Sequence, residues 1–232
     1  MVRGMRGGAL LAALAVAGCG GGGGGSQPPQ EADKGDPEAT KAVKVEAVHA
    51  WLDPDETKKY DNTVAIVVRN TSDKLATGVT AVARWPNGYN TSQQNAIAIP
   101  PKQRAVFLLG PFKPDPPVTG DPKAEVRADK LEAAPSDKAI VEFSDIKQSG
   151  DCAATGTVKN KFEHTHSGTS GLIAGLKDGK IVTAGSIFFE EPGLEPGKTG
   201  TFKADLEPLC PSETPDEWVA YAQLGEQELA EP

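Results

Sequence analysis

The residue pair best suited to bind a metal lies in the segment FEHTHSG, residues 162–168. Residues two positions apart on a β-strand face the same side, so His164 and His166 can present two imidazoles to zinc or copper. No third histidine, cysteine or methionine is close in sequence, and two ligands make a weak site. Two interpretations stay open: a copper or zinc site, or an exposed polar strand end. We favour the second and expect no metal and no cofactor.

Catalytic groups are scarce in the chain. A hydrolase needs a nucleophile beside a base, and only three histidines can serve as that base. The chain has no GxSxG, no HExxH, no phosphate-binding glycine loop and no dinucleotide-binding fingerprint. The paired carboxylates Glu190 and Glu191 stand beside Pro192, which is typical of a solvated hairpin end. We therefore expect that the protein is not an enzyme.

The first eighteen residues have the parts of an export signal. Arg3 and Arg6 supply a positive start, residues 9–17 form an apolar core, and small residues close the segment. The core is shorter than the roughly 20 apolar residues that span a bilayer. We therefore expect residues 1–18 to be a signal peptide and not a membrane-spanning helix.

This segment ends in Val16-Ala17-Gly18-Cys19, which resembles the lipobox of bacterial lipoproteins. The resemblance implies a diacylglycerol on the Cys19 thiol and a cleavage that makes Cys19 the new N-terminus. Two or more acyl chains anchor a protein stably, because each buried methylene contributes about 0.8 kcal/mol. An ordinary signal peptide followed by an incidental cysteine is the alternative. The lipobox interpretation predicts a protein anchored to a bacterial membrane on its extracytoplasmic side, at the cell surface or in the periplasm.

Residues 19–40 are predicted to form a flexible linker behind this anchor. Residues 20–40 are rich in glycine, proline and acidic groups and contain no aromatic or large aliphatic side chain, so they cannot form a core. A flexible chain of this length has a root-mean-square span of roughly 25 Å. Such a linker would hold a folded part clear of the lipid headgroups.

The net charge limits the partners of the protein. The chain carries a formal charge of −8, and removal of the signal peptide takes away Arg3 and Arg6 and no acid, so the charge becomes −10. An acidic chain without a basic cluster argues against binding to nucleic acid and against electrostatic docking on anionic lipid. The expected partners are the membrane, through the lipid anchor, and an extracytoplasmic protein or glycan.

With Cys19 assigned to the lipid, Cys152 and Cys210 remain as a pair. Outside the cytoplasm, two such cysteines usually form a disulfide. Two buried free thiols are the alternative.

The hydrophobic pattern predicts strands. Apolar and polar residues alternate in VKVEAV (43–48) and AEVRAD (124–129), and TVAIVV (63–68) is a continuous run of the kind that fills a sandwich core. Long helical patterns are missing, and 19 prolines and 26 glycines interrupt the chain at short intervals. The pattern favours an all-β fold of antiparallel β-sandwiches.

Three features occur twice along the chain: a strand end with a basic residue and an asparagine, a turn, and a strand that carries a phenylalanine. The spacing between the copies is nearly constant, which predicts two β-sandwich domains, residues 41–134 and 135–226. The matched pairs are Arg69-Asn70 with Lys159-Asn160, Asn87-Gly88 with Asp178-Gly179, and Phe107 with Phe202, at offsets of 90, 91 and 95 residues.

The second copy contains VKN (158–160), KDGKIV (177–182) and LEPGK (194–198). This order resembles the FxLYD-type and related immunoglobulin-like domains that are common in bacterial lipoproteins, and the resemblance covers residues 40–226. It implies two tandem immunoglobulin-like domains after a disordered N-terminal linker. Such domains are mostly adhesive, spacer or binding modules without catalytic activity, so the resemblance implies a class of function and no particular ligand.

A candidate ligand-binding surface lies in RWPNGYNTSQQN, residues 84–95. Trp85 and Tyr89 flank a turn among amide side chains, and aromatic rings with amide neighbours suit sugar or protein surfaces. The alternative is that Trp85 is a core residue at the end of its strand and that only Tyr89 is exposed. The proline-rich loop 110–122 could cover a sheet edge or present Phe112 to a partner.

Overall fold

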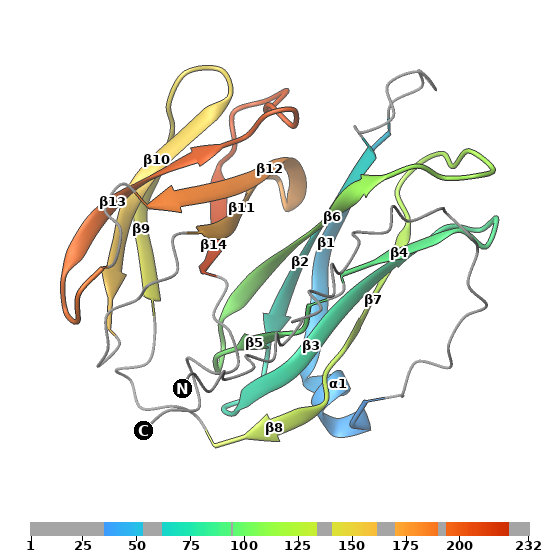
Figure 1. Cartoon of the computed structure of the whole chain (residues 1–232), viewed down its shortest axis with the longest axis horizontal. Coiled ribbons are helices and arrows are strands. Elements are labelled where there is room, and N and C mark those ends of the chain that lie inside the picture. The colour runs from blue at the N-terminus through green and yellow to red at the C-terminus, as the bar shows by residue number, and fades with distance from the viewer. Residues whose placement is uncertain are drawn as a thin grey trace, which may run out of the picture. The chain divides into compact units, whose positions relative to one another are not determined.

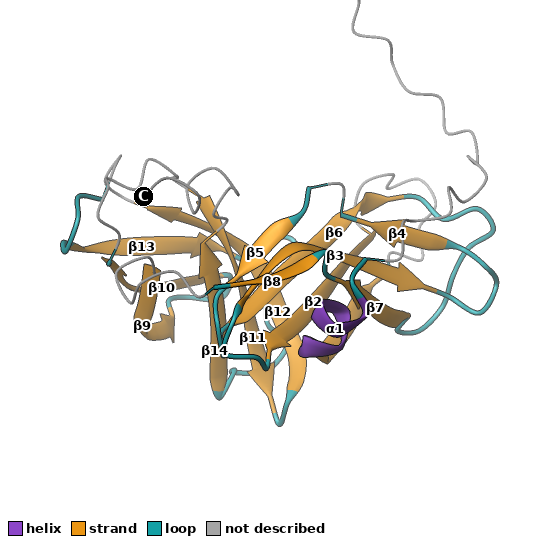
Figure 2. Ribbon diagram, turned by 90° about the horizontal axis from the view of Figure 1, so that it is seen from below, coloured by secondary structure: helices purple, strands orange, loops and turns teal. Residues whose placement is uncertain are grey.

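The computed structural model describes residues 35–52, 62–93, 95–133, 141–161, 170–189 and 194–222. These residues form fourteen β-strands and one short helix, and all strand pairings are antiparallel (Figure 2). The all-β prediction is therefore confirmed. The predicted signal peptide, Cys19 and the linker before residue 35 lie outside the described residues. No helix in the described part of the chain has the length and apolar character needed to cross a membrane.

The first half of the chain begins with a three-stranded sheet of order β1 (Val43–Trp51), β2 (Asn62–Asn70) and β6 (Arg104–Phe112) (Figure 1). Its central strand β2 is buried on both faces. Val64, Ile66 and Val68 face the core of the first half, because alternate residues of a strand point to the same side. This burial on both faces explains why residues 63–68 form a continuous apolar run.

The second sheet of the first half is organised around β3 (Leu75–Arg84). This strand pairs with β4 (Asn90–Ser92), β5 (Ile97–Ile99), β7 (Lys123–Arg127) and β8 (Lys130–Glu132). The buried side chains of the two sheets belong to one apolar cluster, so the sheets pack face to face around a common core.

A short helix, α1 (Pro37–Ala42), precedes β1, and its first four residues overlap the end of the predicted linker, residues 19–40. Asp36 caps it by accepting a hydrogen bond of 2.7 Å from Ala39 N, and Pro37 occupies the first helical position, where no N–H is needed. Ala39 is fully buried in the core of the first half, and the Thr40 hydroxyl donates to Ala128 O at 3.2 Å. The helix therefore belongs to the folded part of the chain.

The second half forms one six-stranded antiparallel sheet of order β14-β11-β12-β13-β10-β9 (Figure 1). Phe143 and Trp218, from the two ends of this sheet, pack against the same cluster around Phe202. The sheet must therefore curl around its own core. The strands are β9 (Val141–Gln148), β10 (Ala153–Asn160), β11 (Ser170–Lys177), β12 (Lys180–Phe189), β13 (Thr199–Asp205) and β14 (Glu217–Ala222).

Strand pairing in the second half repeats that in the first. The order β9-β10-β13 corresponds to β1-β2-β6, and β12-β11-β14 corresponds to β4-β3-β7. The difference is that β12 also pairs with β13, which joins the two groups into one sheet. Gly185 permits this contact, because a Cβ at this position would lie 2.0 Å from Asp205 O.

The two halves share an apolar cluster. Ala65 and Val67, on the second face of β2, belong to the same buried cluster as Leu176 and Val219 from the second half. The Tyr221 hydroxyl also donates a buried hydrogen bond of 2.5 Å to Ala98 O of the first half. The halves therefore pack directly on each other and are not separated by solvent along this interface.

The predicted disulfide between Cys152 and Cys210 is present, with 4.6 Å between the two Cα atoms and 58 positions between the residues in sequence. It joins the residue before β10 to the segment between β13 and β14. The adjacent carbonyl of Leu209 accepts a hydrogen bond of 2.6 Å from the buried Thr183 hydroxyl. Both interactions hold the connection before β14 against the sheet.

Candidate functional site

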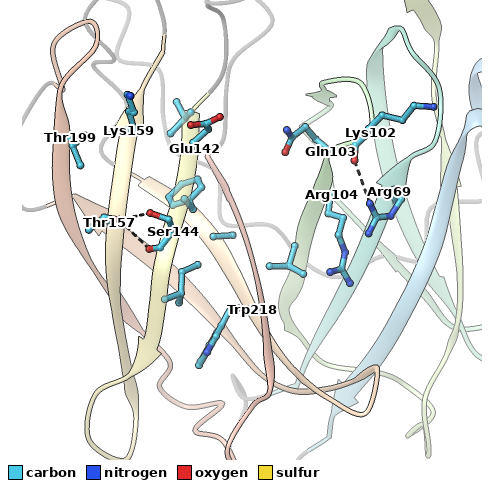
Figure 3. A pocket seen from close by; sticks show the side chains of 15 residues that line it. Arg69, Lys102, Gln103, Arg104, Glu142, Ser144, Thr157, Lys159, Thr199 and Trp218 are labelled. Atoms are coloured by element: carbon cyan, nitrogen blue, oxygen red, sulfur yellow. Dashed lines mark hydrogen bonds between the residues drawn. The ribbon is translucent and has the colours of Figure 1, made fainter. Parts of the chain in front are cut away.

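A groove of about 530 Å³ lies between strands of the first half and strands of the second half (Figure 3). One wall comes from the end of β2, the start of β6 and the turn before β6, and carries Arg69, Lys102 and Arg104. The other wall comes from β9, β10 and the start of β13, and carries Lys159. Strand β14 contributes Trp218 between the two walls.

Two carboxylates hold the two arginines of the first wall, and a main-chain carbonyl holds its lysine. Glu46 accepts from Arg69 Nε at 2.5 Å, and its second oxygen lies 2.6 Å from Arg104 Nε. Arg104 also donates through Nη1 to Glu217 of β14, so this ion pair joins the two halves. Lys102 Nζ donates to Thr71 O at 2.8 Å. The two arginines are therefore positioned charges, because charge-assisted hydrogen bonds hold them.

A buried asparagine positions the turn that carries Lys102. The Asn70 side-chain amide donates to Ile99 O at 2.8 Å and to Pro100 O at 3.2 Å, and Asn70 N donates to Gln103 O at 2.9 Å. Lys102 itself has a φ of 60°, a conformation that requires this support in a non-glycine residue. Asn70 and Arg69 are adjacent on a strand, so one side chain points into the core and the other into the groove.

The second wall repeats this arrangement. Asn160 is fully buried and donates through its side-chain amide to Leu194 O at 2.6 Å, and its N–H donates to Lys198 O at 3.0 Å. The preceding residue, Lys159, is exposed and faces the groove. Gly197, with a φ of 73°, takes the place that Lys102 has in the first half. In each repeat, the asparagine therefore anchors the turn, and the basic residue before it presents a charge to the groove.

Hydroxyl groups lie beside Lys159. The Ser144 and Thr157 hydroxyls, on paired residues of β9 and β10, share a hydrogen bond of 2.6 Å (Figure 3). Asp145 Oδ2 lies 3.1 Å from each hydroxyl and can accept from either. Thr199, which pairs with Lys159 across β10 and β13, adds a third hydroxyl to the wall. These groups offer donors and acceptors for a polar ligand.

The apolar residues that line the groove, here called its floor, come from β9 and β14. Phe143, Ile146 and Trp218 are half-buried side chains that pack against the core of the second half. Phe143 is held in place by an edge-on contact with Phe202, with 5.5 Å between ring centroids. Half-buried aromatic side chains flanked by cations are typical of sites that bind a ligand with both apolar and anionic parts.

The aromatic pair predicted as a ligand site lies elsewhere. Trp85 is only 4% exposed, and its indole N–H donates to Gly120 O at 3.0 Å. Tyr89 is half-buried, and burial raises the pKa of its hydroxyl. Phe112 is buried and stacks on Tyr89. Trp85 and Phe112 therefore form the end of the core, as in the alternative interpretation of Trp85. The role of Trp85 and Tyr89 in ligand binding remains a prediction.

His164 and His166 lie outside the described residues, and so the proposed copper or zinc site remains a prediction. His49 lies within them: its Nδ1 is 3.0 Å from Asp121 Oδ1, and its ring contacts Trp51 edge-on. Among the residues that the structure describes, no three His, Cys, Asp or Glu side chains are grouped so that they could hold a metal ion.

Neither a known family model nor a characterised protein matches this chain. The groove was not predicted from the sequence, although both of its repeated basic residues were identified there as markers of an internal repeat. The spacing of Arg69 and Lys159 in the sequence does not indicate that the two residues face one groove.

Proposed function

We propose that this chain is a lipid-anchored, extracytoplasmic protein that binds a partner without catalysing a reaction, and that the groove is its binding surface. One observation carries the proposal: Arg69 and Lys159, the basic residues of the two repeats, stand on opposite walls above a half-buried aromatic floor. A protein that served only as a spacer would have no need for such a surface.

We also propose that the two repeats are immunoglobulin-like β-sandwich domains. Support comes from the repeated pairing, in which three strands of one group and three of the other recur in the same antiparallel order. The matching hydrogen bonds of Asn70 and Asn160 add local support. Ligand sites occur preferentially at domain interfaces, and here each half contributes one wall of the groove.

The proposed location rests on two separate observations. The segment that ends in Cys19 resembles a lipobox, and a disulfide joins Cys152 and Cys210, as is common in oxidising compartments. In this proposal the lipid is the only contact with the membrane. The partner is then an extracytoplasmic protein or glycan within reach of the anchor.

Photocrosslinking in intact cells tests the proposal. A photoreactive phenylalanine analogue replaces Thr199 in the groove in one variant of the full chain and Lys203 in another. Both residues are exposed on the same face of β13, but only Thr199 lines the groove. We expect a covalent adduct from position 199 and little from position 203. Equal labelling at both positions, or none at 199, would contradict the proposal.

A further inference from the structure

We propose that the groove binds an extended segment of a partner protein that carries carboxylate side chains next to apolar ones. This inference rests on the proposed function and names the chemistry of the partner. It follows from the charge of the walls, the availability of that charge and the apolar floor between the walls.

Four cations line the groove of an acidic protein. Arg69, Lys102, Arg104 and Lys159 line the groove, and Glu142 is the one carboxylate among the lining residues. The whole chain carries a formal charge of −8. Glu46 and Glu217 pair with the two arginines, so Lys102 and Lys159 carry the charge that is least neutralised. These two lysines attract an anionic partner to this place while the acidic remainder of the chain repels it, which is how charge complementarity produces specificity.

Three of these cations are accessible to a ligand. The side chains of Arg69 and Lys102 are 40% and 60% exposed, and Lys159 is also exposed. The ion pair of Lys102 with Asp73 is weak, because the Asp73 side chain is 90% exposed, so a ligand carboxylate can replace it. In the described part of the chain, Lys159 makes no ion pair. Arg104, only 16% exposed, mainly holds the wall together.

A small anion does not satisfy this arrangement. The cations lie on both sides of the groove and Trp218 lies between the two walls, and Phe143 and Ile146 add apolar surface to the lining. One phosphate or carboxylate would contact one wall and leave the apolar floor wet. A chain whose carboxylates and apolar side chains alternate can contact both walls and cover the floor.

The strands that border the groove favour a peptide over a glycan. β9 and β14 are the two ends of the six-stranded sheet, so within the described strands each has one unpaired edge. Unpaired edges offer main-chain donors and acceptors, which an extended peptide matches. The φ of 53° at Asp145 and the shifted register beside it restrict regular pairing on β9 to its first residues. The contact would therefore be short and would depend on side chains for its specificity.

Fluorescence anisotropy with synthetic probes tests the inference on the full folded chain without its signal peptide. The probes are a labelled ten-residue peptide of alternating Glu and Phe and the same peptide with Lys in place of Glu. Inorganic phosphate and polygalacturonate serve as competitors. We expect the Glu peptide to bind at least tenfold more tightly than the Lys peptide. We also expect binding to weaken severalfold between 50 and 300 mM salt, because exposed charges are screened over about 10 Å at 0.1 M.

Charge reversal locates the binding. Arg69→Glu with Lys159→Glu should weaken binding of the Glu peptide at least tenfold. Lys130→Glu with Lys203→Glu makes the same change in net charge at exposed positions outside the groove and should alter binding less than twofold. Because Arg69 also pairs with Glu46, Thr199→Trp is a second variant: it obstructs the groove without changing charge and should weaken binding as well.

Three results would overturn the inference: equal binding of the two peptides, an equal effect of the groove and control reversals, or displacement of the peptide by phosphate alone. Preferential binding of polygalacturonate would assign the groove to a glycan. If photocrosslinking at position 199 succeeds but the Glu peptide does not bind, the ligand chemistry is wrong and the proposed function stands. If neither succeeds, both are wrong.

Discussion

Asn160 makes the same side-chain contact in the second half as Asn70 makes in the first. Each is completely buried at the end of its strand, and each donates its amide to the carbonyl of the residue that enters a turn, Ile99 or Leu194. The next strand starts directly after that turn. The asparagine therefore connects two strands of each half and also fixes the basic residue that precedes it in the groove.

We expect Asn70→Ala and Asn160→Ala each to destabilise the protein by about 1–3 kcal/mol, because buried carbonyls lose their donor. Three carbonyls surround the two amide hydrogens of Asn70, and the nearest is Lys74 O at 2.7 Å. Urea unfolding measures both changes. Asn95→Ala, at an exposed position, is the control and should change the free energy of unfolding little. Equal stability of all three variants would refute the anchoring role.

Loss of the disulfide should lower stability substantially. Closing a loop of about 58 residues contributes roughly 4 kcal/mol in the chain-entropy account. We expect Cys152→Ser with Cys210→Ser to lower the melting temperature, in one transition, because the two halves share an apolar cluster. Differential scanning calorimetry measures this change. Thiol labelling of unreduced, denatured protein should find neither cysteine free, and two labelled residues would contradict the disulfide.

Tyr221 should couple the two halves. Tyr221→Phe removes the hydroxyl that donates to Ala98 O and leaves that carbonyl without this donor, so we expect a loss of about 1–3 kcal/mol. Tyr89→Phe is the matched control, because Tyr89 is half-buried and none of the hydrogen bonds described for this chain uses its hydroxyl. Equal stability of the two variants in urea would show that the buried hydrogen bond has no net effect.

Asp216 should make stability depend on pH in the acid range. A hydrogen bond from Asp178 N, at 3.3 Å, together with Lys177, holds the pKa of the Asp216 carboxyl below its ordinary value of 3.8. A carboxyl with a lowered pKa in the folded state contributes stability above 3.8, and this contribution disappears as the pH falls through the folded value. As the pH falls from 5 to 2.5, the free energy of unfolding of Asp216→Asn should therefore decrease less than that of the wild type. Parallel pH profiles in urea would contradict the assignment.

Cys19→Ser should release the protein from the membrane. The substitution removes the thiol that the lipobox interpretation assigns to the diacylglycerol, and a chain without it has no acyl anchor. Membrane fractions washed without detergent should retain the wild type and lose the variant. If the variant stays in the membrane fraction, the anchor assignment is wrong.

Local features were predictable because they depend on neighbours in sequence. Alternation in residues 43–48 and 124–129 indicated strands. Residues 43–48 lie in β1, and residues 124–127 lie in β7, with 128 and 129 directly after it. Asp178 and Gly179 were predicted as a turn, and both have positive φ values, 49° and 73°, as a two-residue hairpin requires. The pairing of Cys152 with Cys210 followed from their number and setting.

Tertiary structure decided what these elements do together. Residues 63–68 are apolar on both faces because the second half covers the face of β2 that the first half leaves open. Trp85 is buried because Phe112, distant in sequence, packs on it at 5.5 Å. The sequence determined that Arg69 and Lys159 each follow a strand pattern and precede an asparagine. Only the packing of the two halves brings them to one groove, because that depends on side-chain contacts between residues about ninety positions apart.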